Sequence, residues 1–459
     1  MSATGEIYKN VLGIAAKYSQ EWLNSVPLRD VNPAKTANEI RDDLGSFLPY
    51  EATDPSVVIE KLANVGEAGL MSMGSGRFFG WVIGGTLPAA LGADWLVSTW
   101  DQNAASRIAT PTTAAVEEIA SKWLLEILGL PSTADVGFPT GGMMANFTGL
   151  ISARQKVLTD VGWDLDRKGL IGAPAVRVLV GEERHETVDR ALRYLGLGRP
   201  IEVAADDQGR IRVDSLRLAL ESGSGPTIVC LQAGNLHSGA FDPFREAIKL
   251  AHEHGAWVHV DGAFGLWALA SPTLRPKLDG IELADSWATD AHKTLNVPYD
   301  CGVAIVAQPS VLRNTYGIHA SYLILADDDQ GDPSEKVPEF SRRARGVPVW
   351  AALLSLGRHG VSELVDRLVA NARLMAAGLA KIEGCRVLNE ISFTQVCFAF
   401  ESEERTEEIC AHLLEDKSIW ISGSKWRGQS VLRVSVSNWS TNAEDVAIAI
   451  EAVQRAARA

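Results

Sequence analysis

The sequence predicts an α/β protein in which helices cover both faces of a mostly parallel central sheet, followed by a small C-terminal α+β domain. Three observations lead to this expectation. Apolar runs typical of buried strands alternate with amphipathic runs of helical period between residues 176 and 306. This spacing is typical of β-α-β units, which build parallel sheets. After residue 360 the order changes to one long helical pattern and then short apolar runs around one further helix.

The composition argues against several classes of protein. A length of 459 residues favours two domains, or one large domain with appendages. The net charge of −14 argues against a nucleic-acid partner or an anionic membrane surface, because both require basic patches. No apolar run approaches the roughly 18 residues of a membrane span, and the N-terminus lacks a secretory signal pattern. The five scattered cysteines fit a reducing compartment, so we expect a cytoplasmic protein.

Residues 1–75 mix helical patterning with polar loops. Ile7, Val11 and Leu12 fall near helical spacing, and so do Val58 and Leu62. Neither stretch carries enough apolar positions to form a core of its own. We therefore expect an N-terminal helical arm that packs on another domain or on a second subunit.

The expected large domain, residues 76–325, opens with a segment dense in aromatic residues and glycines. This segment covers residues 77–95 with the sequence RFFGWVIGGTLPAALGADW. Such a segment can line a pocket, although aromatic clusters form plain core more often. Thr110 followed by Pro111 then predicts a helix start, because proline fits the first helical position.

A glycine-rich turn follows at residues 138–150, FPTGGMMANFTGL. Thr140 is expected to cap a helix that opens with Gly141 and Gly142. A helix N-terminus of this kind offers free N–H groups and the positive end of the helix dipole to an anion. Many helix starts share the pattern and bind nothing, so the signal is weak when taken alone.

The alternating part of the chain contains the residues that we expect at one edge of the sheet. Strands are expected at residues 176–180, 226–234 and 256–265, separated by amphipathic helices at 183–196 and 242–255. In open α/β sheets, ligands bind beyond the carboxyl ends of the strands. Four polar side chains follow such ends or the turns after them: His185, Asn235, Asp261 and Lys293.

Lys293 lies between an expected strand at 286–289 and an apolar run at 303–306. Partial loss of hydration there disfavours an ammonium ion, as a Schiff-base lysine requires. A solvated turn lysine is the plainer interpretation of this stretch alone. The alternative for Asp261 is a helix cap or loop anchor, and for His185 a helix cap. No His or Cys spacing indicates a metal site.

The order of these segments resembles that of the group II pyridoxal-phosphate amino-acid decarboxylases, which include the aromatic-amino-acid and glutamate decarboxylases. The similar segments are the phosphate turn FPTGGMMAN, the histidine segment ERHETVDRA, the turn QAGNLHSGAFDPF, the aspartate strand VHVDGAFG and the lysine segment DAHKTLNVPYDCG. The segments RFFGWVIGGTLPAALGAD, ATPTTAAVEE, SRRARGVPVW and LRVSVSNW extend the resemblance over most of the chain.

The resemblance implies the fold type I of pyridoxal-phosphate-dependent transferases, with pyridoxal 5'-phosphate as cofactor. It makes Lys293 the Schiff-base lysine, Asp261 the partner of the pyridine nitrogen and His185 the residue stacked on the ring; these three are the expected catalytic residues. The other expected cofactor contacts are Thr140, Gly141, Gly142 and His292 at the phosphate, Asn235 near the 3-oxygen and Ala263 under the ring. Candidate substrate contacts are Phe79, Trp81 and Arg433, and for Arg433 a structural salt bridge is the alternative.

The resemblance also implies the reaction, α-decarboxylation of an L-amino acid by a homodimer. The first alternative is another carbon–carbon bond reaction on the same cofactor, such as aldol-type cleavage or decarboxylative condensation. The second is a non-catalytic homologue that keeps the fold. The substrate is a small molecule, and neither nucleic acid nor membrane is an expected partner.

The chain departs from the family pattern in two places. An acidic, aperiodic stretch at residues 326–345 is expected to be a mobile loop before the small domain at 346–459. It lacks the tyrosine that the family's catalytic loop usually carries, and Glu339, Lys336 or the earlier Tyr322 would have to replace it. Trp81 and Gly84 stand where aromatic-amino-acid decarboxylases tend to have tyrosine and threonine. These departures count against ordinary protonation after decarboxylation, and against aromatic substrates in particular.

Overall fold

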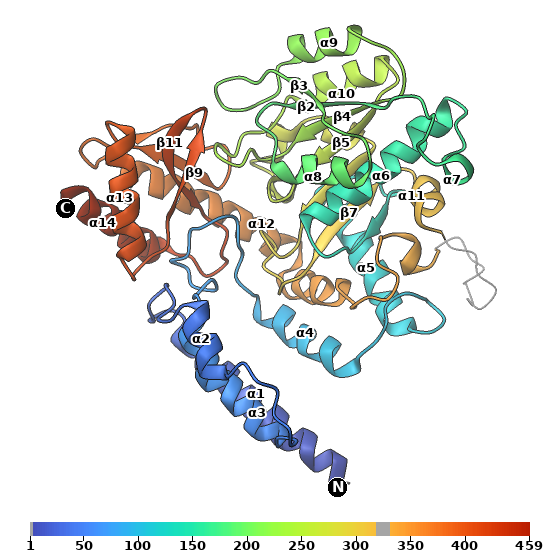
Figure 1. The fold of residues 1–459 in the computed structure, drawn as a ribbon. Coiled ribbons are helices and arrows are strands. Elements are labelled where there is room, and N and C mark those ends of the chain that lie inside the picture. Colours follow the sequence, from blue (N-terminus) through green and yellow to red (C-terminus); the bar gives the residue numbers. More distant parts are fainter. Residues whose placement is uncertain (1–2, 318–330) are drawn as a thin grey trace.

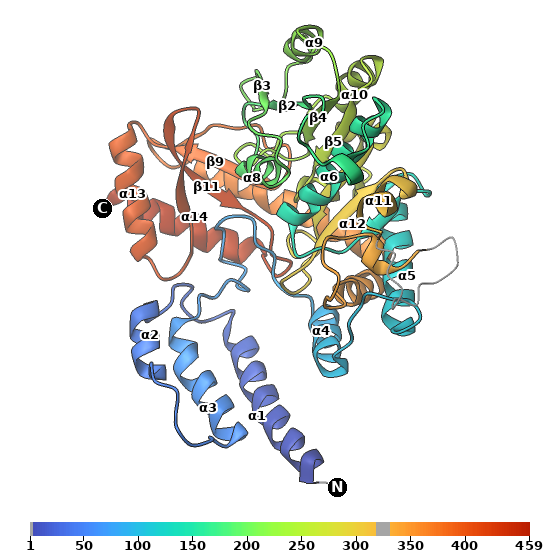
Figure 2. The ribbon, with the colours of Figure 1, turned by 45° about the vertical axis from the view of Figure 1, so that its right-hand side comes forward.

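The computed structural model describes residues 3–317 and 331–459. It shows an arm of three helices, a large part built on a seven-stranded sheet and a smaller part built on a four-stranded sheet (Figure 1). The arm projects away from the rest of the molecule in two views turned by 45° (Figure 2). Its helices are α1 (Ala3–Ser25), α2 (Ala37–Leu44) and α3 (Pro55–Gly66).

The arm has little core of its own. α1 packs against α3, but neither α2 nor α3 has a buried residue. Local signals define both short helices: Thr36 forms a capping box with Glu39 at the start of α2, and Asp54 caps α3 ahead of Pro55. The arm is therefore held by local structure and by one helix pair, and much of its apolar surface stays exposed.

The large sheet has the mostly parallel order that the sequence predicts. Its strands are β1 (Asp135–Gly137), β2 (Arg177–Gly181), β3 (Ile201–Val203), β4 (Thr227–Gln232), β5 (Trp257–Asp261), β6 (Ser286–Asp290) and β7 (Gly302–Val306). Within the described residues they lie in the order β1-β7-β6-β5-β4-β2-β3. Strands β3, β2, β4, β5 and β6 are parallel, whereas β7 runs antiparallel to both β6 and β1.

Helices cover both faces of this sheet because its strands are apolar on both sides. Val178 and Val180 of β2 pack into a cluster with Leu150 and Val188, whereas Leu179 between them faces a second and larger cluster. The helices of this part are α4 (Pro88–Trp100), α5 (Pro111–Leu128), α6 (Gly142–Asp160), α7 (Leu165–Lys168), α8 (Glu186–Tyr194), α9 (Val213–Glu221), α10 (Phe244–Glu253) and α11 (Pro309–Tyr316). Short 3-10 turns are η1 (Glu67–Gly69), η2 (Gly265–Ala270), η3 (Arg275–Leu278), η4 (Ile281–Leu283) and η5 (Pro333–Glu335).

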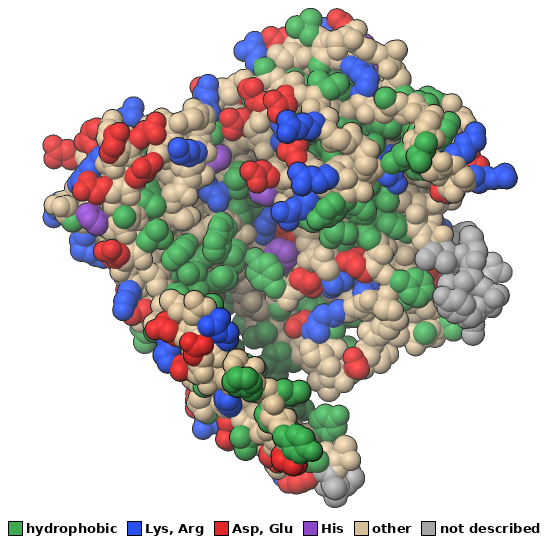
Figure 3. Space-filling view, viewed as in Figure 1, with side chains coloured by type: hydrophobic (Ala, Val, Ile, Leu, Met, Phe, Trp, Pro, Cys, Tyr) green, Lys and Arg blue, Asp and Glu red, His purple; other side chains and the backbone are tan. Residues whose placement is uncertain are grey.

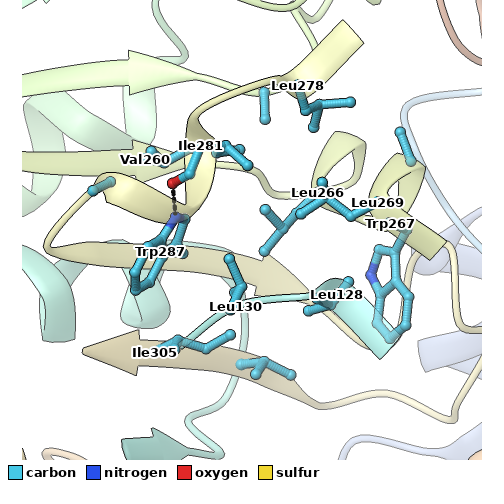
Figure 4. Close-up of a cluster of buried hydrophobic side chains, with 14 of the residues drawn as sticks. Leu128, Leu130, Val260, Leu266, Trp267, Leu269, Leu278, Ile281, Trp287 and Ile305 are labelled. Carbon is cyan, nitrogen blue, oxygen red and sulfur yellow. Dashed lines mark hydrogen bonds between the residues drawn. The ribbon is translucent and has the colours of Figure 1, made fainter. Parts of the chain in front are cut away.

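The larger cluster contains the bulkiest buried side chains of the sheet. Figure 4 shows part of it, where the indole Nε1 of Trp287 donates a hydrogen bond to the carbonyl oxygen of Ile281 at 2.9 Å. Trp267 is likewise fully buried, and its Nε1 donates to the Asp290 carbonyl oxygen. Both tryptophans therefore satisfy their polar atom inside the core.

The smaller part is an antiparallel sheet packed on three helices. Its strands, in the order β10-β11-β9-β8, are β8 (Arg386–Val387), β9 (Gln395–Ala399), β10 (Ser422–Trp426) and β11 (Gln429–Ser435). Its helices are α12 (Gly346–Leu379), α13 (Glu403–Glu415) and α14 (Ala443–Arg458). α12 kinks at Gly357, and it packs on α4 and α5 as well as on α14, so it joins the two parts of the molecule (Figure 1).

The 77–85 segment (residues 77–85) also joins the two parts. Its Phe79 N–H donates to the Trp420 carbonyl oxygen at 2.9 Å, and the Ser435 N–H donates to the Phe79 carbonyl oxygen at 3.0 Å. An early stretch of the chain therefore lies beside β11, far away in sequence. The sequence alone does not predict this pairing, because the pairing leaves no local signal in either segment.

The expected strands, and the helices expected at 183–196 and 242–255, appear with shifts of a few residues at their ends. The helix expected after residue 360 is the second half of α12, which already begins at Gly346. Of the expected loop at 326–345, residues 326–330 lie outside the described residues, as does Tyr322. Residues 331–345 contain η5, and Asp332 and Arg342 within them are buried. In the part of the chain that is described, no helix is both long and apolar enough to span a bilayer.

Candidate active site

A cavity of about 380 Å³ lies at the carboxyl ends of the central strands. Its lining comes from the strand ends of the large sheet and the turns after them, the starts of α6 and α8, the 77–85 segment and β11. Seven of the expected site residues line it: Trp81, Gly142, His185, Asp261, Ala263, Lys293 and Arg433. The volume falls in the range of small-molecule sites, and the position is the one where open α/β sheets bind ligands.

Asp261 and His185 enter the cavity from neighbouring elements. Asp261 ends β5 in a buried position, and its Oδ1 accepts a hydrogen bond from the Ala263 N–H at 3.2 Å. His185 caps α8, since its Nδ1 accepts from the Thr187 N–H at 3.2 Å. Burial lowers the pKa of His185 by more than the Asp261 carboxylate raises it, so the ring is neutral at neutral pH. His185 therefore caps a helix and lines the cavity at the same time.

Lys293 lies in the turn after β6, close to a carboxylate. Its Nζ is 2.9 Å from Oδ2 of Asp290, whose side chain is only 1% exposed. The backbone of this turn is tightly packed, because a Cβ placed on Gly84 would come within 2.1 Å of the Lys293 carbonyl oxygen. Glycine is thus required at position 84, where aromatic-amino-acid decarboxylases tend to have threonine.

Asn296 holds the lysine turn in place from several sides. Its Oδ1 accepts from the N–H groups of Gly85 and Trp439, at 2.5 and 2.9 Å. Its Nδ2 donates to the Ser437 carbonyl oxygen at 3.1 Å, and its own N–H donates to the Lys293 carbonyl oxygen at 3.1 Å. Asn296 is fully buried with φ +55°, a left-handed conformation that asparagine tolerates better than most residues.

The start of α6 differs from the sequence prediction. Thr140 is predicted to cap this helix, and that is wrong, because Gly141 is the N-cap and no side chain caps the first turn. The backbone is fully extended at Gly141, which separates Thr140 from the first turn, and the Thr140 N–H donates instead to Oε1 of Glu339 at 3.2 Å. The first N–H groups of a 19-residue helix are therefore left without a capping side chain beside Gly142, which lines the cavity.

His292 lies behind Lys293 and against Tyr299. The two rings stack with their centroids 4.2 Å apart. The His292 Nδ1 accepts from the Cys301 N–H at 3.1 Å, so its proton is on Nε2, which lies 3.4 Å from Oδ1 of Asp290. Burial lowers the pKa of His292 more strongly than the Asp290 carboxylate raises it. His292 is thus a neutral ring whose Nε2 lies near a buried carboxylate without a hydrogen bond to it.

Arg433 presents a nearly buried cation to the cavity. Its Nη1 donates to the Leu236 carbonyl oxygen at 2.9 Å, and burial lowers its pKa to about 10. No carboxylate among the described residues forms an ion pair with Arg433. The alternative of a structural salt bridge is therefore wrong for this part of the chain. A buried guanidinium without a carboxylate partner is suited to bind a carboxylate ligand.

The remaining expected contacts are divided between the cavity and its surroundings. Trp81 lines the cavity with φ +48° and a half-exposed side chain. Phe79 is fully buried in the core of the small domain. Asn235 organises the turn after β4, since its Oδ1 accepts from the N–H groups of His237 and Ser238, at 2.9 and 3.1 Å. Neither Phe79 nor Asn235 is among the residues that line the cavity.

Sequence reasoning missed Asp290, Tyr299 and Asn296. Asp290 carries the same signal as Asp261, a carboxylate at the end of a buried strand, and could have been found from it. Tyr299 lines the cavity, but no local sequence pattern indicates that its side chain would lie there.

The structure places two of the candidate replacement acids away from this cavity. Lys336 pairs with Asp135 at 2.6 Å, and Glu339 lies beside Thr140. Neither is among the residues that line the cavity. The third candidate, Tyr322, lies outside the described residues.

The residues around the cavity fit pyridoxal 5'-phosphate. An uncapped helix N-terminus suits the phosphate, and Asp290 lies beside the glycines at its start. The buried carboxylate of Asp261 suits the pyridine nitrogen, the neutral ring of His185 can stack on the pyridine, and Lys293 supplies an amine for the aldehyde. The chain thus supplies a group for each functional part of the cofactor.

Comparison with known proteins also indicates a pyridoxal-dependent enzyme. Residues 44–401 match the pyridoxal-dependent decarboxylase conserved domain. The acidic amino acid decarboxylase GADL1 of Bos taurus is 31% identical over 332 residues, covering 70% of this chain and 63% of that protein. The cysteine sulfinic acid decarboxylase of Mus musculus is 29% identical over 80% of this chain and 75% of its own length. The aromatic-L-amino-acid decarboxylase of Bacillus atrophaeus is 26% identical over 93% and 90%.

The chain thus matches less than two thirds of the length of the GADL1 relatives. Solved structures give the fold. The structure of mouse CSAD has a TM-score of 0.89 at 24% identity, covering 99% of both chains. The structure of Oryza sativa TDC with PLP and tryptamine has a TM-score of 0.91 at 23% identity, covering 100% of this chain and 99% of that one. The fold predicted from the sequence is therefore confirmed.

Proposed function

Because the chain belongs to the pyridoxal-dependent decarboxylase family, we propose that it removes the α-carboxylate of an L-amino acid as carbon dioxide, using pyridoxal 5'-phosphate. One observation carries the proposal. Within the matched domain, Lys293, Asp261 and His185 line one cavity, although they come from separate elements. Arg433 brings a buried cation to the same cavity from β11.

Each of these residues has a task that follows from its chemistry. Lys293 holds the cofactor covalently through Nζ, and Asp261 keeps a proton on the pyridine nitrogen. The N–H groups at the start of α6 bind the phosphate. When bound, the cofactor supplies a conjugated ring that accepts the electron pair of the breaking Cα–carboxylate bond. Arg433 binds a substrate carboxylate, and the walls of the cavity exclude water from the reacting carbon.

The wall of the cavity favours an uncharged and bulky substrate side chain. Trp81, Val82, Ile83 and Leu236 supply apolar surface. Among the described residues that line the cavity, the only lysine or arginine besides Lys293 is Arg433. An acidic substrate would need a further cation for its second carboxylate, because a buried charge without a partner is unfavourable. We therefore propose aromatic or large apolar L-amino acids rather than aspartate, glutamate or cysteine sulfinate.

The test is carbon dioxide release from a panel of L-amino acids by the purified protein loaded with pyridoxal phosphate. We expect release with the largest kcat/KM for an aromatic or bulky apolar member. The Asp261→Asn variant should keep its fold and lose turnover by several powers of ten, because a preorganised charge is missing. Absence of release from every amino acid would contradict the proposed reaction. A clear preference for acidic substrates would contradict only the proposed side-chain class.

We also propose that the protein is a homodimer in which the arm packs on the second subunit. Ile7, Leu12 and Leu62 on the arm are each more than half exposed, and Trp95 and Trp100 on α4 are also exposed. Figure 3 shows hydrophobic side chains along the arm, among charged ones. Apolar surface of this extent on a projecting element supports an interface between copies of the chain. The cytoplasm is the proposed compartment, and cell fractionation tests it.

A further inference from the structure

Asp290 is a buried carboxylate that the proposed reaction does not use. It ends β6 with 1% exposure, and its Oδ2 lies 2.9 Å from the Lys293 Nζ. Oδ1 lies 3.4 Å from the His292 Nε2. Among the described residues neither oxygen accepts a hydrogen bond of good geometry, so charge rather than directed bonding holds the carboxylate. A buried carboxylate of this kind is unfavourable unless a cation stays beside it.

The same carboxylate faces the start of α6. A Cβ placed on Gly142 would lie 2.5 Å from Oδ2 of Asp290, and one on Gly141 would lie 3.6 Å from Oδ1. This is the uncapped helix N-terminus that fits the cofactor phosphate. Asp290 thus places a negative charge where a second anion has to bind, and repulsion between like charges is strong in a buried site.

Lys293 is affected by the same charge. Its Nζ forms an ion pair with Asp290 at 2.9 Å, whereas only the neutral amine is nucleophilic. Bonding to the cofactor requires the ammonium to give its extra proton to solvent. The amine nitrogen then forms a C=N bond with the aldehyde carbon, and the aldehyde oxygen leaves as one water. The ion pair with Asp290 has to be released before this can happen.

We propose that Asp290 is a positioning residue that weakens cofactor binding, because it holds the Lys293 ammonium and opposes the phosphate at the start of α6. The protein then binds pyridoxal phosphate reversibly and exchanges it with solution. The inference rests on the proposed function only in taking this cavity as the cofactor site. Cofactor binding is measured without any amino acid, so failure of the decarboxylation proposal leaves this test intact.

The test compares wild type with Asp290→Asn, each stripped of cofactor and titrated with pyridoxal phosphate. Asparagine keeps the shape of the side chain and removes its charge. We expect the Kd of Asp290→Asn for pyridoxal phosphate to fall by at least about tenfold, because one buried like-charge contact is lost. Binding is followed by the absorbance of the lysine-bound cofactor, and the melting temperature checks the fold. Asp290→Ser replaces Asp290→Asn if the latter does not fold.

Asp300→Asn is the matched control. Asp300 lies in the same loop, but its carboxylate is partly exposed and pairs with Arg345 at 2.9 Å. The Kd of Asp300→Asn for pyridoxal phosphate should stay within about twofold of that of wild type, because exposed charges are screened. An equal tightening by Asp300→Asn would mean that general loss of negative charge is responsible, and would overturn the assignment to Asp290.

Pyridoxal without its phosphate separates the two effects of Asp290. Tightening that appears only with pyridoxal phosphate assigns the effect to repulsion of the phosphate. Equal tightening with both compounds assigns it to release of Lys293. An unchanged or larger Kd of folded Asp290→Asn for both compounds overturns the proposal. Failure of every variant to bind pyridoxal phosphate overturns it together with the cofactor site itself.

Discussion

Tyr299 places a phenol in the cavity of a chain whose 326–345 stretch has no tyrosine. Its ring stacks on His292, and more than half of the residue is exposed to solvent. Partial desolvation by its neighbours together with Asp290 raises its pKa to about 12. The hydroxyl therefore keeps its proton at physiological pH and can donate it. After carbon dioxide leaves, the α-carbon must take up a proton to give the amine. Among the described residues that line the cavity, Tyr299 carries a hydroxyl that we propose as the source of this proton.

Tyr299→Phe removes only this hydroxyl. We expect amine formation to slow by about 100-fold, the lower range for a positioned acid. The share of aldehyde formed in the presence of oxygen should rise. The Kd for pyridoxal phosphate should not change, because the ring still stacks on His292. Tyr194→Phe on the exposed face of α8 is the control. Fast and stereospecific incorporation of one deuterium by Tyr299→Phe would show that another group is the acid.

At the scale of residues, sequence reasoning found the side chains whose neighbours in the chain reveal them. Asp261, His185 and Lys293 each lie at the end of an expected strand or in the turn after one, and the cavity brings them together. Phe79 and Asn235 carry comparable local signals but point elsewhere, because direction depends on packing against distant residues. Asn296 was missed since its partners Gly85, Ser437 and Trp439 are remote in sequence.

At the scale of elements, the turn after β6 depends on Asn296. Asn296→Ala would leave the N–H groups of Gly85 and Trp439 buried without an acceptor. We expect the free energy of unfolding in urea to fall by about 2–4 kcal/mol, with weaker binding of pyridoxal phosphate. Asn296→Gly adopts the left-handed backbone conformation easily but lacks the side-chain amide. We expect this variant to be destabilised almost as much as Asn296→Ala. A glycine variant as stable as wild type would show that only the backbone conformation matters.

His259 couples three elements through its ring. Nδ1 on β5 pairs with Ser286 Oγ of β6, and Nε2 pairs with Asn146 Oδ1 of α6, both at 2.9 Å. Burial lowers its pKa to about 3, below the ordinary value of 6.5. The folded protein therefore binds fewer protons here than the unfolded chain, and this stability is present above pH 6.5 and lost as the pH falls towards 3.

The expected result is a loss on the order of a few kcal/mol between pH 6.5 and 4, beyond that of the carboxylates. The measurement is urea unfolding of wild type and His259→Gln across this range. The glutamine variant should be less stable at pH 8 but should lose less on acidification. Parallel pH profiles for the two proteins would exclude His259 as the origin of the acid sensitivity.

Element boundaries were predictable where turns and caps mark them, as at Pro111 for α5 and Asp54 for α3. The start of α6 was not, because a threonine before two glycines fits two different caps. The choice depends on Glu339, which binds the Thr140 N–H. Pairing of the 77–85 segment with β11 was likewise outside the reach of local patterns.

At the scale of the whole molecule, the exposed arm is the feature that carries a prediction. Leu12→Glu combined with Leu62→Glu places charge on an apolar surface that we propose to be buried between subunits. Wild type should sediment at twice the 49.4 kDa of one chain, and the double variant as a monomer at micromolar concentration. Lys17→Glu, already polar and exposed, is the control. A monomeric wild type would contradict the proposed interface between subunits.

The pairing of the 77–85 segment with the end of the chain also sets a delay during synthesis. Arg77 donates to the Ser418 carbonyl oxygen across a separation of 341 residues. At about 5–20 residues per second, the ribosome needs roughly 20–70 s to deliver that partner. Until then the 77–85 segment has no partner, and the lysine turn, once made, likewise lacks Ser437 and Trp439 until they are synthesised. The apolar residues of the 77–85 segment therefore stay without their partner strand until the small domain has been synthesised.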